Sequence, residues 1–264
     1  MSKVLVERRA GITVLTLNRP EVHNCVDGET AVAIASAIDE FGRDAGARVL
    51  VVTGAGTRAF CSGADLKNVQ TLLQHPWVDR AGPMGFARLD PGKPTIAAVN
   101  GYSFAGGMEL AAWCDFRIAA ANAEFGALNR RWGVPFTDGG TQRFARIVGQ
   151  GNALYLVETG MRIDAHRALA MGLVQEIVPA GEALVRALAL AERVAAYPQA
   201  SVYADRAATL ATFGLSLPDG LRVEAGTCVP TAYDPEMTAG LQRFISGDRP
   251  EAPRPPTGVT APRA

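Results

Sequence analysis

Short apolar runs alternate with amphipathic segments along the first half of the chain. The runs at 4–6, 12–17 and 49–53 are rich in β-branched residues and predict strands. The last of them is continuously apolar, as is typical of a strand covered on both faces. After Asp27, apolar residues instead recur at helical spacing, and this aspartate is a candidate N-cap. Strands that alternate with helices predict an α/β fold with crossover connections.

The stretch 93–116 carries the most informative chemistry. An apolar run at 95–99 predicts a buried strand, and after an Asn-Gly turn Gly106 and Gly107 open a helix that carries Glu109. Glycines let a ligand approach the backbone closely, and the free N–H groups of a helix start are donors for an anion. Such donors beside a carboxylate in an apolar wall suit chemistry next to a carbonyl group. In the alternative interpretation, Glu109 only compensates the helix dipole.

A second glycine-rich segment, 54–66, follows the predicted strand at 49–53. It matches neither a Walker loop nor the G-x-G-x-x-G fingerprint of dinucleotide-binding proteins, which argues against nucleotide hydrolysis and hydride transfer. From there to Lys93 the sequence is irregular. We expect a surface loop in this segment, with a mobile cover over a pocket as the alternative.

The second half of the chain continues the alternation. A strand is expected at 115–119, and a glycine-bearing turn at 129–141 enters a helix. Asp138 lies just before that helix, as a candidate cap or as an ion-pair partner of Arg130 or Arg131. The following elements are helices from about Gln142, Asn152 and Asp164, a strand at 174–178, and a long helix that ends at Tyr197.

Pro198 marks a change in the pattern, because the chain from there to Ser246 predicts helices only. We therefore divide the chain into a core (1–197), a helical region (198–248) that packs on the core or on a neighbouring subunit, and a tail (249–264). The tail is rich in Pro, Gly, Ala and Thr and is expected to be disordered.

Composition narrows the class of protein. The 264 residues suffice for one large domain or a core with an appendage. Because 26 basic residues balance 26 acidic ones, net charge gives no reason to expect nucleic acid or a membrane as a partner. The N-terminus lacks the apolar core of a signal peptide, and no apolar run is long enough to span a bilayer. We therefore expect a cytoplasmic protein.

Cysteine and histidine usage argues against a metal centre. The cysteines form no C-x-x-C pair, and we expect them to be reduced, mostly buried thiols. The histidines lie far apart in the sequence, so no metal site is expected. These residues are Cys25, Cys61, Cys114, Cys228, His23, His75 and His166.

Several short motifs occur in the order and spacing of a known family. They are TLNRP at 16–20, AFCSGADL at 59–66, KP at 93–94 with NG at 100–101, GGMEL at 106–110, CD at 114–115 and GGTQR at 139–143. Over nearly the whole chain to Pro179, this series resembles the crotonase, or enoyl-CoA hydratase/isomerase, superfamily. The resemblance implies a spiral of ββα units with C-terminal helices that build homotrimers, often paired into hexamers. It also implies an acyl-CoA substrate and no permanently bound cofactor.

The resemblance further implies a thioester site. Two backbone N–H groups hold the thioester oxygen in the family, and by position they belong here to Ala64 and Gly106. Preorganised donors of this kind favour the enolate by roughly 3–4 kcal/mol each. Other matching positions imply contacts with coenzyme A or the acyl chain: Val22, His23, Phe60, Ser62, Asp65, Leu66, Asn129, Trp132 and Phe136.

The sequence departs from the family at one catalytic position. Hydratases of the family use two glutamates, of which one matches Glu109 and the other falls at Asn129. Asparagine cannot accept or deliver a proton. Asp138 offers a carboxylate instead, as some isomerases and dehalogenases do at or next to this position.

Three hypotheses follow from this departure. We favour a lyase or isomerase in which Glu109 and Asp138 divide the acid and base work at an enoyl thioester. The second is a dehalogenase or hydrolase with Asp138 as the nucleophile. The third is an acyl-CoA-binding protein without catalysis.

Overall fold

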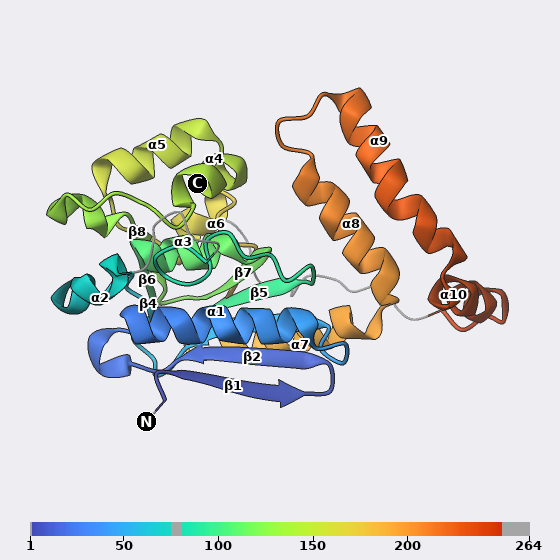
Figure 1. Ribbon diagram of the computed structural model, residues 1–264, viewed down its shortest axis with the longest axis horizontal. Coiled ribbons are helices and arrows are strands. Elements are labelled where there is room, and N and C mark those ends of the chain that lie inside the picture. Colours follow the sequence, from blue (N-terminus) through green and yellow to red (C-terminus); the bar gives the residue numbers. More distant parts are fainter. Residues whose placement is uncertain (1, 75–80, 250–264) are drawn as a thin grey trace.

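The computed structural model describes residues 2–74 and 81–249, and these residues form two β-sheets (Figure 1). The large sheet has the strand order β1-β2-β3-β5-β7-β10, and the small sheet has the order β4-β6-β8-β9. The strands of the large sheet are β1 (Val4–Arg9), β2 (Ile12–Leu17), β3 (Val49–Gly54), β5 (Thr95–Val99), β7 (Phe116–Ala120) and β10 (Glu176–Val178). Those of the small sheet are β4 (Ala59–Cys61), β6 (Tyr102–Phe104), β8 (Glu124–Gly126) and β9 (Ile163–Asp164).

The chain winds through the two sheets as a spiral. β1 and β2 form an antiparallel pair, and the pairs from β2 to β10 in the large sheet are all parallel. β3, β5 and β7 are each followed by a short strand of the small sheet, β4, β6 and β8. Parallel neighbours require crossover connections, and α1 (Gly28–Arg43) supplies the first of them. The Asp27 side chain caps this helix, as the sequence predicts, by accepting a hydrogen bond from the Thr30 N–H.

Helices cover both faces of the large sheet. Val49 and Val51 of β3 pack with the alanines of α7 (Ala183–Ala196), whereas Leu50 and Val52 belong to the core on the opposite face. This explains why β3 is apolar at every position. The remaining helices are α2 (Val69–Leu73), α3 (Gly106–Trp113), α4 (Gly140–Val148), α5 (Gln150–Thr159), α6 (Ala165–Ala170), α8 (Gln199–Ala211), α9 (Leu217–Cys228) and α10 (Pro235–Ile245). Short 3-10 turns are η1 (Pro20–Val22), η2 (Leu66–Asn68), η3 (Leu128–Trp132) and η4 (Val229–Tyr233).

Two predicted elements differ in detail. The segment after Leu66 contains the short helix α2, which the irregular sequence did not predict. The strand expected at 174–178 begins only at Glu176, because the N–H groups of Leu173 and Val174 instead bond the Ala168 carbonyl at the end of α6. The other predicted strands and helices are confirmed to within a few residues.

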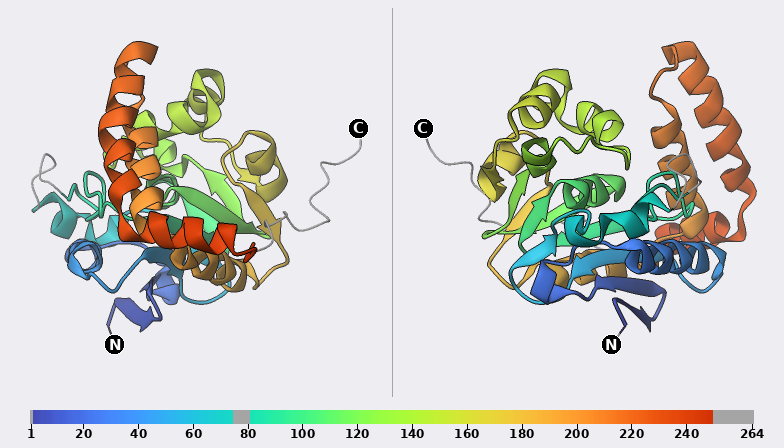
Figure 2. Two further views of the ribbon diagram at one scale, coloured as in Figure 1. Left: turned by 90° about the vertical axis from the view of Figure 1, so that its right-hand side faces the viewer. Right: turned by 60° about the vertical axis from the view of Figure 1, so that its left-hand side comes forward.

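The helices after Pro198 stand beside the sheets. α8 and α9 pack on each other, and Figure 2 shows this pair extending away from the body of the molecule. Arg206 of α8 ties the pair to the core by donating hydrogen bonds to Asp115 and Asp90, at 2.8 and 2.9 Å. The division at Pro198 stays a prediction, and the predicted tail beyond Arg249 lies outside the described residues.

Thiols and membrane spans can be placed within the described part of the chain. All four cysteines are free, and Cys61 and Cys114 are buried. Among the residues at 2–74 and 81–249, no helix combines the length and apolarity needed to cross a membrane.

A buried arginine joins the N-terminal hairpin to the loop after β4. Arg19 donates to the Asp65 carboxylate at 2.9 Å and to the Cys25 carbonyl at 2.7 Å, and its guanidinium lies 3.4 Å from Asp27. These side chains are about nine-tenths buried. Loss of one partner of a buried ion pair leaves the other charge uncompensated. Arg19 therefore fixes the loop that carries Ala64.

We expect Arg19→Met to lower the free energy of unfolding by about 3–5 kcal/mol, because two carboxylates lose their guanidinium. Denaturant unfolding measures this change. The matched control is Arg8→Met, which removes an exposed pair with Glu40 and should cost less than about 1 kcal/mol. Equal losses in the two variants would contradict a structural role of the buried network.

Candidate active site

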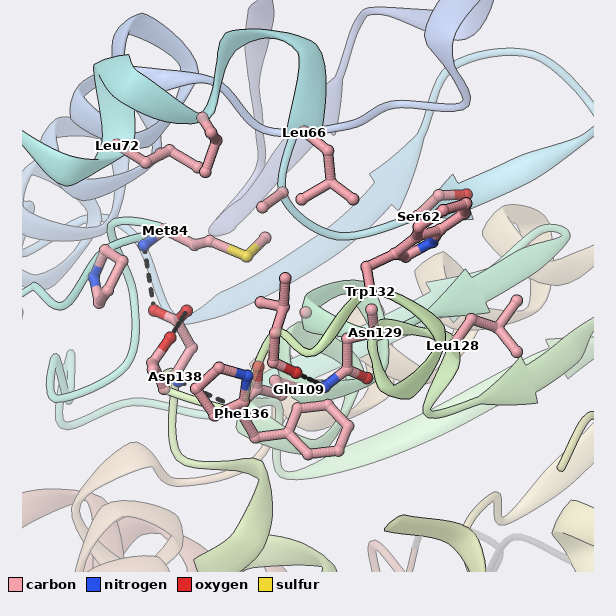
Figure 3. Close-up of a pocket in the computed structure, with 18 of the residues that line it drawn as sticks. Ser62, Leu66, Leu72, Met84, Glu109, Leu128, Asn129, Trp132, Phe136 and Asp138 are labelled. Carbon is pink, nitrogen blue, oxygen red and sulfur yellow. Dashed lines mark hydrogen bonds between the residues drawn. The ribbon is translucent and has the colours of Figure 1, made fainter. Parts of the chain in front are cut away.

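A cavity of about 140 Å³ is lined by segments that follow the small-sheet strands β4, β6 and β8 (Figure 3). Its walls are mostly apolar. Four segments line it: 62–73 with α2, 83–84, the start of α3 at 105–109, and 128–138 with η3. Among the described residues, Glu109 and Asp138 are the two carboxyl groups that line it. Figure 3 shows both side chains with Asn129 at the same side of the cavity.

Glu109 lies in the first turn of α3 and is 2% exposed. Its Oε1 accepts hydrogen bonds from the N–H groups of Asp138, at 2.9 Å, and Gly140, at 2.8 Å. Both bonds use one oxygen, so the other remains available to a ligand in the cavity. Burial raises the pKa of Glu109 to about 8, and the charge of Asp138 adds to the rise. At neutral pH the group is therefore mostly a protonated acid.

Asp138 is also buried, and its Oδ1 accepts a hydrogen bond from the Met84 N–H at 3.0 Å. Burial raises its pKa, while the N–H donor and two neighbouring arginines, Arg88 and Arg143, oppose the rise. The predicted role as a helix cap is wrong, because α4 begins at Gly140 with Gly139 as N-cap and no side-chain bond. The carboxylate instead turns away from the helix to the backbone at Met84.

Arg130 and Arg131 do not pair with Asp138 in the described part of the chain; the arginines near it are Arg88 and Arg143. Arg143 donates to the Asp138 carbonyl at 3.0 Å and to the Ala87 carbonyl at 2.6 Å. It thereby fixes the turn that carries Asp138 to the segment that carries Met84.

Two glycines allow this turn to approach Glu109. Gly139 has a φ of 93°, and a Cβ there would collide with the Arg143 guanidinium. A Cβ at Gly140 would lie 2.7 Å from Cγ of Glu109. Only glycine at both positions permits the turn to donate its N–H groups to the carboxyl group.

Ala64 and Gly106 both line this cavity. A Cβ on Gly63 would lie 2.8 Å from the Gly106 nitrogen, which places the loop after β4 directly against the start of α3. Ala105 enters the helix in a strained conformation with a φ of 51°. Neither amide donates to an acceptor within the ranges 2–74 and 81–249. The pair is thus available to an oxygen atom of a ligand.

Asn129 of η3 is 7% exposed and lines the cavity. Its Nδ2 donates to the Val134 carbonyl at 2.8 Å. Its Oδ1 is buried without a hydrogen-bond partner among the described residues.

The remaining predicted site residues fall into two groups. Ser62, Leu66, Trp132 and Phe136 line the cavity, with Trp132 largely exposed at its edge. The others do not line it. Phe60 is fully buried in β4, so its side chain packs in the core and cannot contact a ligand.

Asp65 holds its carboxylate on Arg19 rather than toward the cavity. Val22 ends η1, and His23 follows in a left-handed conformation with its ring edge-on to Tyr102. Both therefore lie outside the cavity lining.

Sequence reasoning missed the apolar wall formed by α2 and Met84. Val69, Leu72 and Leu73 of α2 and the Pro83–Met84 pair line the cavity. The only signal for them was the helical spacing of three apolar residues, which is too short a pattern to identify a helix. No cluster of three or more metal-ligating side chains occurs in the part of the chain that the structure describes.

Comparison with known proteins agrees with this architecture. The family model described as enoyl-CoA hydratase/isomerase matches residues 7–251. A crotonyl-CoA hydratase of Syntrophomonas wolfei is 35% identical over an alignment of 254 positions that covers 92% of this chain and 98% of that protein. The 2,3-dehydroadipyl-CoA hydratase of Escherichia coli is 32% identical over 95% of this chain and 98% of its own length.

Comparison with solved structures supports the same fold. The crystal structure of enoyl-CoA hydratase EchA1 from Mycobacterium marinum superposes with a TM-score of 0.87 and 34% identity, covering 94% of this chain and 98% of that one. The predicted crotonase-like α/β fold is confirmed. The chain therefore belongs to the enoyl-CoA hydratase/isomerase family, within the crotonase superfamily, and is an enzyme of that family.

Proposed function

We propose that the enzyme adds water to, or shifts the double bond of, an enoyl-CoA thioester through an enolate. The observation that carries this proposal is one apolar cavity lined by two buried carboxyl groups and by two residues, Ala64 and Gly106, whose N–H groups have no acceptor among the described residues. The N–H groups of Ala64 and Gly106 would hold the thioester oxygen, on which negative charge develops. Coenzyme A arrives with the substrate, and no permanently bound cofactor is needed.

The protonation states divide the work between the carboxyl groups. Glu109, with its pKa raised to about 8, holds the proton that the α-carbon receives. Asp138 acts as the base: burial raises its pKa, while the N–H of Met84 and the positive charges of Arg88 and Arg143 oppose that rise and favour the ionised form. Water attacks the β-carbon and gives its proton to Asp138, while the π electrons move to the thioester oxygen. Protonation of the α-carbon by Glu109 then completes the addition.

The names of the relatives support hydration over the other branches. The matched curated proteins include a crotonyl-CoA hydratase and a short-chain-enoyl-CoA hydratase. Double-bond isomerisation uses the same enolate and the same acid, so it stays within the proposal. The alternatives are attack by Asp138 as a nucleophile in a dehalogenase or hydrolase, and binding without turnover.

The coenzyme would lie along the loop after β4. Ser62 and Leu66 face the cavity, and Leu66 is 44% exposed at its mouth, where a pantetheine arm enters. We further propose that Val22, His23 and Asp65 flank the coenzyme outside the cavity, as the family resemblance implies.

We also propose a homotrimer, alone or as a dimer of trimers. Large apolar side chains on the C-terminal helices are exposed in the single chain, among them Leu217 (76%), Tyr233 (86%) and Ile245 (82%). Many large exposed apolar side chains on neighbouring elements are typical of protein–protein interfaces.

Glu109→Gln and Asp138→Asn should each lower kcat for crotonyl-CoA hydration by about 10²–10⁴-fold, because each removes one proton-transfer group. The measurement is the loss of the conjugated enoyl-thioester absorbance. The control is Glu124→Gln, which removes a carboxylate of β8 that pairs with Arg162. This change should leave the rate unchanged.

The outcomes separate the hypotheses. Full activity of Asp138→Asn would sink the two-carboxylate mechanism. A covalent adduct on Asp138 would identify a nucleophile, and tight binding of acyl-CoA without any turnover would identify a binding protein.

The pH dependence of kcat/KM should be bell-shaped. Activity falls above pH about 8, because ionised Glu109 has no proton to give. It falls in acid as Asp138 takes up a proton, at a pH above the usual aspartate range because burial raises its pKa. Removal of the Asp138 charge lowers the pKa of Glu109, so residual activity of Asp138→Asn should be lost at lower pH. A rate that stays constant well beyond pH 8 would refute the assignment of Glu109 as the acid.

Light scattering on the purified protein should give a mass three or six times that of one chain, because association covers the apolar C-terminal helices. Replacing Leu217 and Ile245 with aspartate should lower that mass. A monomer in the unaltered protein would contradict the proposal.

A further inference from the structure

Arg143 of α4 lies close to the two carboxyl groups without lining their cavity. It lines a second cavity, of about 640 Å³, instead. Phe136 and Thr137 line both cavities, so the segment just before Asp138 forms part of the wall between them. The guanidinium group therefore acts on the carboxyl groups from outside the cavity in which the substrate would bind.

The hydrogen bonds of Arg143 join the two segments that hold these carboxyl groups. One N–H donates to the carbonyl of Asp138, whose own N–H donates to Glu109. Another donates to the carbonyl of Ala87, three residues after Met84, whose N–H donates to the Asp138 carboxylate. A guanidinium group carries several N–H donors in a fixed plane, so one side chain can bridge both carbonyls. The contacts that fix Glu109 and Asp138 thus depend on segments that Arg143 ties together.

The charge of Arg143 reaches the carboxyl groups without covering them. In the part of the chain that the structure describes, Arg143 forms no ion pair with Glu109 or Asp138, and its printed partners are backbone carbonyls. Its positive charge nevertheless opposes the rise in the pKa of both groups. A direct ion pair would occupy carboxylate oxygens that the proposed chemistry uses, whereas a cation behind the turn leaves them unoccupied.

Other charged or titratable groups also surround Asp138. Arg88, from the segment after α2, opposes the rise in its pKa as well. Cys61 of β4 lies near Asp138 and Cys114 lies near Arg143, but burial raises the pKa of both thiols far above neutrality, so they stay uncharged. Among these neighbours, Arg143 combines a nearby charge with a hydrogen bond to the backbone of Asp138 itself.

We propose that Arg143 is a positioning residue for the two carboxyl groups, which holds the turn at 138–140 in place and stabilises the Asp138 carboxylate from behind. The inference rests on the proposed function, because it assumes that Asp138 is the base and Glu109 the acid. Since Arg143 lies outside the substrate's cavity, its loss should change kcat and leave KM nearly unaltered.

The test is the pH profile of kcat/KM for crotonyl-CoA in Arg143→Gln, which removes the charge and keeps a donor. Loss of a positive charge raises the pKa of both carboxyl groups. The acid limb, where Asp138 must lose its proton, and the alkaline limb, where Glu109 must keep its proton, should therefore both move up by about one pH unit. A merely structural role would lower the whole profile and leave its limbs in place.

Arg143→Lys separates the charge from the bridge, because an ammonium group has no planar fork to span two carbonyls. Its limbs should stay near those of the unaltered enzyme, while kcat per folded molecule falls about ten- to hundredfold at an unchanged KM.

The control is Arg146→Gln. Arg146 lines the same second cavity but donates to Gln142 of its own helix. Its loss should change neither the limbs nor kcat.

Limbs that stay in place in Arg143→Gln, or that move equally in Arg146→Gln, would overturn the inference. An unchanged kcat in folded Arg143→Lys would also overturn it, and this result decides the matter if Arg143→Gln does not fold. Absence of turnover in the unaltered enzyme would instead refute the proposed function, and the inference with it.

Discussion

The burial of the Glu109 carboxyl group beside Asp138 is the constraint on which the rest of the site depends. A carboxyl group that is 2% exposed cannot ionise cheaply, so its pKa rises to about 8 and the group stays protonated at neutral pH. Two N–H groups from the turn at 138–140 hold the group in place without forcing its ionisation. The turn can come this close only because Gly139 and Gly140 lack a Cβ, and Arg143 then fixes it from behind. The turn that buries Glu109 thus also places beside it the N–H groups and the Asp138 carboxyl group on which its proposed role depends.

A second consequence concerns the two carboxyl groups as a pair. Both are buried, yet Asp138 has an N–H donor from Met84 and two arginines nearby, whereas Glu109 shares its environment with the Asp138 charge. Burial raises the pKa of both groups. The division of acid and base work that we propose requires that their different neighbours separate the two pKa values. Asn129 lies at the same cavity and titrates over no relevant range.

Much of this arrangement was predictable from local pattern. The apolar run 49–53, the glycines at 106–107 and the capping Asp27 each indicate one local structure, and each prediction is confirmed. The role of Asp138 was not predictable in this way, since an aspartate before a helix most often caps it. Its actual partner, the Met84 N–H, is 54 residues distant in the chain. The sequence pattern did not predict the apolar wall at α2 for a similar reason. A five-residue helix is stabilised by the residues it packs against rather than by its own periodicity.

The sequence by itself determined the alternation of strands and helices, the family through motifs in register, and the identity of the groups available for chemistry: Glu109, Asp138 and an asparagine where a second glutamate was expected. These follow from short-range periodicity and residue type, which are local properties. Only the tertiary structure decided which groups meet, how far each carboxyl is desolvated and that the side-chain oxygen of Asn129 has no hydrogen-bond partner among the described residues. Desolvation and hydrogen-bond pairing depend on atoms from segments far apart in the chain. The packing of those segments, rather than any local pattern, therefore sets the protonation and the polarity of the site.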